Sequence, residues 1–166
     1  MRFSRFTALA AFAALPTLAQ AQVSTSVQAT ATVVTPLAIN GAAPLAFGSV
    51  FQSVPKTVSA TDASSGRFGI TGSNAAQVAL TFTLPANLSA TGGLLLPIDT
   101  WDVRTNGINS TGGATTLAVT SGTPVNTSLV LGNLFVFVGG RVVPSATQAA
   151  GSYAGTVVLA AAYTGL

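Results

Sequence analysis

The chain has 166 residues, of which 49% are hydrophobic and only 5% are charged, far below the usual share of about 25%. It contains no histidine, no cysteine and no glutamate. These absences exclude a histidine-based catalytic triad, a thiolate nucleophile and a zinc site built from the usual ligands. We therefore predict a protein that is not an enzyme and needs no cofactor or metal.

The first 21 residues have the three parts of a secretory signal peptide. Arg2 and Arg5 form a basic start, an apolar stretch follows, and the segment ends in the small-x-small motif Ala19-Gln20-Ala21. The apolar stretch is about a dozen residues long, whereas a membrane-spanning helix needs roughly 20. We expect cleavage after Ala21 and export through the Sec pathway to the periplasm, the cell surface or the extracellular space.

The expected mature chain, residues 22–166, has the length of one domain. Its four basic and three acidic side chains leave a net charge of +1, so nucleic-acid binding is not expected. No segment of it has the length and apolar character of a transmembrane helix. Its surface must be coated mainly by uncharged polar side chains. Little electrostatic repulsion would then separate two copies, which suits a protein that packs against itself.

The mature chain opens with a long alternating pattern that ends before Pro36. Between residues 23 and 33 the even positions hold only Ser, Gln and Thr, and the odd positions are mostly apolar: Val23, Val27, Ala29, Ala31 and Val33. This period of two predicts an amphipathic strand within residues 22–35. Two interpretations stay open. The segment is either the first strand of its own sheet or a donor strand that adds to an open sheet edge of the next subunit.

Further alternating or apolar runs follow in chain order, separated by Gly and Pro. They predict strands around 45–54, at 68–70, 77–84, 94–98, 101–104, 115–119, 129–138 and 153–163, with a long exposed loop at 105–113. We therefore predict an all-β domain, an immunoglobulin-like or pilin-like β-sandwich of about seven to nine antiparallel strands.

The single tryptophan and its acidic neighbours are the most suggestive polar and aromatic side chains. Trp101 is expected to pack in or near the core, and the alternative is a platform on which a sugar ring stacks. Asp99 and Asp102 flank it. Because calcium needs six to eight oxygen ligands, two carboxylates are better explained as caps of backbone amides.

The C-terminal stretch contains Gly151, Tyr153, Gly155 and Tyr163, and this spacing resembles the C-terminal strand of chaperone–usher pilins. A wider resemblance rests on the ordered elements Leu45-Ala46-Phe47-Gly48, Phe68-Gly69-Ile70, Val138-Gly139-Gly140 and Gly151-Ser152-Tyr153. In this order they are similar to the bacterial domain-of-unknown-function family numbered 4402. The resemblance implies an exported, β-rich, pilin-like protein, and it implies no active-site residues.

Together these patterns predict a structural subunit of a cell-surface fibre or extracellular layer. Its expected partners are further copies of itself, joined by strand addition, together with a periplasmic chaperone and secretion machinery. The alternative is a monomeric secreted adhesin or carbohydrate-binding module that uses Trp101 and the loop 105–113.

Overall fold

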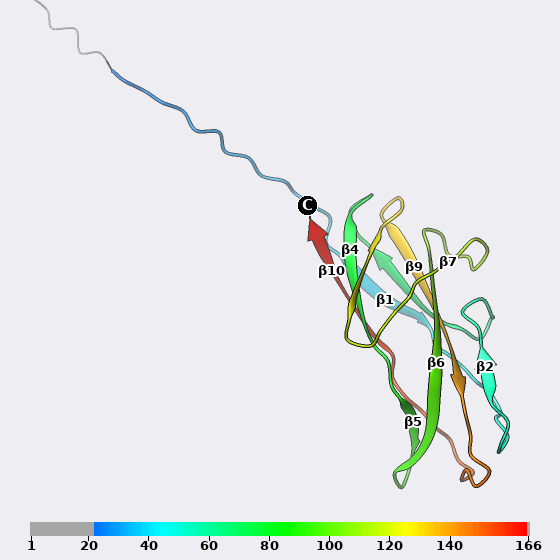
Figure 1. The fold of residues 1–166 in the computed structure, drawn as a ribbon. Helices are drawn as coiled ribbons and strands as arrows, with labels where there is room; N and C mark the ends of the chain where they lie inside the picture. The colour runs from blue at the N-terminus through cyan, green and yellow to red at the C-terminus, as the bar shows by residue number, and fades with distance from the viewer. Residues whose placement is uncertain (1–21, 166) are drawn as a thin grey trace, which may run out of the picture. The chain divides into compact units, whose positions relative to one another are not determined.

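The computed structural model describes residues 22–165, so the predicted signal peptide at 1–21 lies outside the described residues. Within 22–165 no residue is helical, so this part of the chain contains no helix that could cross a membrane. Ten strands form instead (Figure 1). They are β1 Ala38–Ala43, β2 Lys56–Val58, β3 Gly66–Thr71, β4 Gln77–Thr83, β5 Asn87–Ala90, β6 Leu94–Asn106, β7 Thr115–Thr116, β8 Pro124–Ser128, β9 Asn133–Val142 and β10 Val158–Gly165.

The strands form two sheets in which every pair is antiparallel. The larger sheet has the order β1-β3-β9-β6-β5, with β2 added beside β9 and β7 beside β6. The smaller sheet has the order β10-β4-β8. The prediction of an all-β sandwich is confirmed. The number of strands exceeds the prediction because four strands, β1, β2, β5 and β8, lie outside the predicted runs. The strand predicted around 45–54 is wrong, since this segment forms turns and irregular structure.

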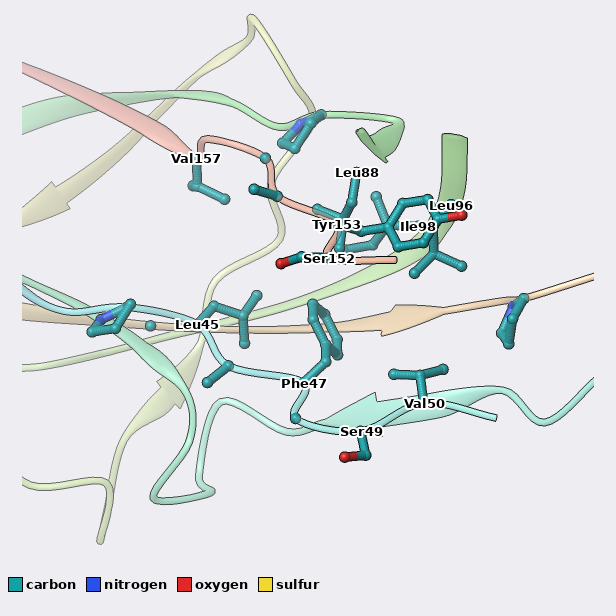
Figure 2. A pocket seen from close by; sticks show the side chains of 18 of the residues that line it. Leu45, Phe47, Ser49, Val50, Leu88, Leu96, Ile98, Ser152, Tyr153 and Val157 are labelled. Carbon is teal, nitrogen blue, oxygen red and sulfur yellow. The ribbon is translucent and has the colours of Figure 1, made fainter. Parts of the chain in front are cut away.

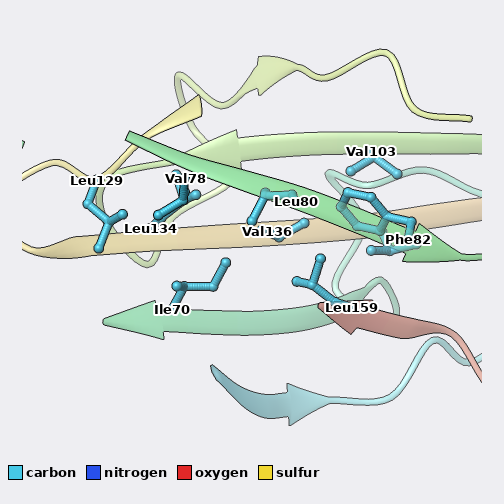
Figure 3. Close-up of a cluster of buried hydrophobic side chains, with 10 residues drawn as sticks. Ile70, Val78, Leu80, Phe82, Val103, Leu129, Leu134, Val136 and Leu159 are labelled. Carbon is cyan, nitrogen blue, oxygen red and sulfur yellow. The ribbon is translucent and has the colours of Figure 1, made fainter. Parts of the chain in front are cut away.

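The main hydrophobic core lies between these sheets (Figure 3). Strand β4 follows the predicted alternation, since Val78, Leu80 and Phe82 are fully buried. They face side chains of the larger sheet, including Ile70 and Val136. Burial of every second side chain is what a strand with one solvent-facing side requires. A second, smaller cluster of Leu96, Ile98 and Val142 continues the core toward the start of β6.

Several predicted boundaries are wrong, and those around β6 differ most. The runs 94–98 and 101–104 belong to one strand, β6, which also takes Thr105 out of the predicted loop and buries it. Pro97 does not break this strand, because its carbonyl still accepts the N–H of Val143 at 2.9 Å. A bulge between Ile98 and Thr100 absorbs the irregularity.

Candidate assembly groove

Two strands at neighbouring edges of the two sheets lack a partner on one side. In the described part of the chain, β1 pairs only with β3, and β10 pairs only with β4. Ile39 on β1 lies opposite the fully buried Ile70 and therefore faces the core, yet 37% of its surface is exposed. Among residues 22–165 no strand closes the sandwich between β1 and β10, so the core-facing side chain of Ile39 is partly open to solvent there.

One end of this open edge is tied together by Tyr163 near the end of β10. Its hydroxyl donates to the carbonyl of Thr35 at 2.7 Å and accepts the N–H of Ser73 at 2.8 Å. The N–H of Thr35 in turn donates to the hydroxyl of Ser73 at 2.9 Å. A side chain at Gly72 would collide with this hydroxyl, so glycine is needed beside it. We call this cluster of Thr35, Ser73 and Tyr163 the latch.

At the other end the edge widens into an apolar groove with a volume of about 1140 Å³ (Figure 2). One wall is residues 43–52, which follow β1, and the other is residues 148–157, which precede β10. Phe68, Leu88, Leu96, Ile98 and Trp101 also line it. We call this cavity the edge groove. Figure 2 shows Phe47, from one wall, on one side and Tyr153, from the other wall, on the opposite side.

Polar contacts fix the far end of the two walls to each other. The side-chain amide of Gln52 donates to the carbonyl of Gln148 at 2.6 Å. The Gln148 amide donates to the hydroxyl of Tyr153 at 2.7 Å and to the carbonyl of Leu95 at 3.0 Å. The latch thus joins the two edges at one end, these contacts join the two walls at the other, and the edge groove lies between them.

The structure redistributes the predicted C-terminal strand motif. Strand β10 begins only at Val158, so Gly151, Tyr153 and Gly155 precede it and form one groove wall. Backbone hydrogen bonds between Ala154 and Ser89 hold this wall against β5. Residues before Val158 therefore do not continue the pairing of β10 with β4. A side chain at Gly155 would collide with Leu88. Tyr163 lies in β10 as predicted, but its partners in the latch were not foreseeable from sequence.

The N-terminal segment forms no strand. No residue from 22 to 37 is assigned to a strand, and the first strand is β1. Val23, Val27 and Val33 are 93%, 94% and 97% exposed, and Ala29 and Ala31 are exposed as well. The strand predicted within residues 22–35 is therefore not formed in this structure. We call residues 22–33 the N-terminal arm.

The structure does not bring the residues of the predicted sugar site together. Trp101 is half-buried and lines the edge groove. It packs against both hydrophobic clusters, as expected for a residue in or near the core. No residue of the loop 105–113 lines that groove.

Asp102 caps backbone and hydroxyl donors, as predicted, because its Oδ2 accepts the N–H of Ala60 at 2.9 Å and the hydroxyl of Ser59 at 3.0 Å. Burial opposes its ionisation, but these donors and Arg104 outweigh burial and hold its pKa below the ordinary value. Asp99 makes a different contact, an exposed ion pair with Arg141, whose hydrogen bonds lower the pKa of Asp99.

The described residues contain no group of three acidic, histidine or cysteine side chains that could hold a metal ion. The groove itself is lined by uncharged residues, both apolar and polar. The sequence matches no protein-family model and no curated protein. The resemblance to the family numbered 4402 therefore stays a prediction.

Proposed function

We propose that this chain is an exported, non-enzymatic structural protein, a subunit of a pilus-like cell-surface fibre or extracellular layer. The N-terminal arm of one subunit adds as a strand to the β10 edge of the next and fills its edge groove. The observation that carries this proposal is the coexistence of an arm with exposed alternating valines and a sandwich edge that lacks one strand. A long apolar strand without a partner is a hazard that assembly removes.

The arm and the open edge agree in length and chemistry. Residues 23–33 extend about 35 Å at roughly 3.3 Å per residue. The eight residues of β10 span about 26 Å on the same scale, and the edge groove continues beyond them. The apolar face of the arm would cover side chains that are now exposed, such as Ile39, and its polar face would lie toward solvent.

An almost uncharged surface suits this mode of assembly, because little electrostatic repulsion would separate two copies. Main-chain hydrogen bonds supply the affinity in this mode, and pockets for alternate side chains supply the specificity. A periplasmic chaperone would be expected to protect the open edge before assembly, since an unfilled edge of this kind invites wrong pairing. On this proposal the mature chain acts outside the cytoplasm.

The test compares the two faces of the arm in purified residues 22–166. Val27→Asp places a charge on the apolar face, and Gln28→Asp places the same charge one residue later on the polar face. Gel filtration and negative-stain electron microscopy would measure assembly. We expect polymers from the wild type and from Gln28→Asp, and monomers from Val27→Asp and from a variant lacking residues 22–33. If the wild type stays monomeric at high concentration, or if the arm-deleted variant still polymerises, the proposal is wrong.

A further inference from the structure

Two groups of exposed apolar side chains lie at opposite ends of the sandwich. Ile108, Val130 and Leu131 are 62%, 53% and 80% exposed. Gly107 packs directly against Val130, so the loop that carries Ile108 adjoins the turn that carries Leu131. This turn is bonded to Gly72, next to the latch, by the Gly72 N–H and the Gly132 carbonyl at 3.0 Å. We call these three side chains the latch-end patch.

The second group lies near the end of the edge groove where Gln52 and Gln148 meet. Phe51, Val54, Leu94 and Leu95 are 72%, 53%, 38% and 55% exposed. The amide of Gln148 donates to the carbonyl of Leu95, and the side chain of Gln52, next to Phe51, donates to the carbonyl of Gln148. We call these four side chains the groove-end patch. Neither patch contains a charged residue.

The strand directions place the patches at opposite ends. Strand β6 starts at Leu94, beside the groove-end patch, and ends at Asn106, just before the latch-end patch. Strand β9 runs the other way, from Asn133 after Leu131 to Val142 (Figure 1). The two patches are therefore separated by the full length of the longest strands.

We infer that the latch-end patch of one copy packs on the groove-end patch of the next, as a second interface beside the strand exchange. This inference rests on the proposed function. The latch holds Thr35, so the arm leaves its own domain beside Tyr163, and Val33 lies only two residues farther out. Wherever Val33 enters a neighbour, the latch-end patch of the donor must follow.

The direction of the arm decides what that patch meets. An arm antiparallel to the neighbour's β10 runs from the latch end past the start of β10 and into the edge groove, because the arm is longer than β10. Val33 then lies toward the groove-end patch, so unlike ends meet. A parallel arm would bring two latch ends together and close a two-fold dimer. Antiparallel pairing is the more stable per residue, and every strand pair of this sandwich is antiparallel. Contact between unlike ends does not close, and it propagates into a fibre.

The absence of cysteine allows a direct test by crosslinking. Leu131→Cys and Phe51→Cys together place one thiol in each patch of residues 22–166. The matched control, Leu131→Cys with Ile108→Cys, places both thiols in the latch-end patch. Each variant is assembled, treated with a flexible bismaleimide and separated on a denaturing gel, and cysteine-free wild-type protein is assembled in parallel. A second opposite-end pair, Leu131→Cys with Leu95→Cys, tests a different residue of the groove-end patch, so that one thiol lying out of reach of the crosslinker does not decide the result.

The expected result is a ladder beyond the dimer for both opposite-end pairs and no such ladder for the same-end control. If the wild type polymerises but neither opposite-end pair gives a ladder, the end-to-end interface is wrong and strand exchange stands. If the same-end control gives mainly dimers, like ends meet and the inference is also wrong. If the wild type does not polymerise, the proposed function fails, and the inference fails with it.

Discussion

Replacing Asp102 with alanine should destabilise the domain much more than replacing Asp99, although Asp99 has the better ion pair. Asp99 bonds Arg141 through both carboxylate oxygens, with an Nη2–Oδ2 distance of 2.5 Å. Asp102 reaches Arg104 only at 3.4 Å. The difference lies in the other partners, because Asp102 also accepts the N–H of Ala60, whose residue is fully buried.

The magnitude follows from what each substitution leaves behind. Asp102→Ala removes two hydrogen bonds to a charged acceptor and leaves a backbone N–H without a partner, a loss of about 2–3 kcal/mol after allowing for partial exposure. In a domain of this size that lowers Tm by about 5–10 °C. The exposed pair of Asp99 and Arg141 is screened by water, so Asp99→Ala should leave Tm close to that of the wild type.

The assay is thermal unfolding followed by circular dichroism at neutral pH, with arm-deleted protein so that assembly does not raise the apparent Tm. Asp102→Asn serves as the graded control, since its amide oxygen can take the place of Oδ2 and accept both hydrogen bonds, but without the negative charge. We expect it to lie between the wild type and Asp102→Ala. Equal destabilisation by Asp99→Ala and Asp102→Ala would refute the claim that the buried N–H, and not the ion pair, determines the effect.

Three further outcomes are expected. Phe82→Ala, at a fully buried position between the sheets, should lower the free energy of unfolding by about 3–5 kcal/mol in a denaturant titration. Gly139→Ala should lower it by about 3 kcal/mol or more, because its Cβ would collide with the rigid backbone of residues 58–60; soluble, equally stable Gly139→Ala protein would contradict this. Stability should be flat from about pH 5 to 9, because no histidine or cysteine is present. The folded pKa of Asp102 lies below its ordinary value of 3.8, so this carboxylate stabilises the fold above that value. That stability is lost as the pH falls through the folded pKa of Asp102. A Tm shift of several degrees between pH 5 and 9 would contradict the predicted flat stability in that range.

The alternation of apolar and polar side chains was enough to predict the class of the fold. It located β4 and the inward face of β10 correctly, because burial of one face leaves a direct trace in every second residue. The lack of histidine, cysteine and glutamate was likewise visible in composition and removed the usual catalytic machinery from consideration. The N-terminal arm was recognisable as amphipathic, but its pattern could not say whether it pairs within its own sheet or with another copy.

What the tertiary structure decided depends on contacts between residues far apart in the chain. Tyr163 meets Thr35 and Ser73, and residues 148–157 face residues 43–52 across a groove, although no local pattern connects them. Alternation specifies which face of a strand is buried, whereas its hydrogen-bonding edge uses backbone groups that are the same in every residue. Whether an edge is paired or open is therefore invisible in a single sequence and is settled only when the sheets assemble.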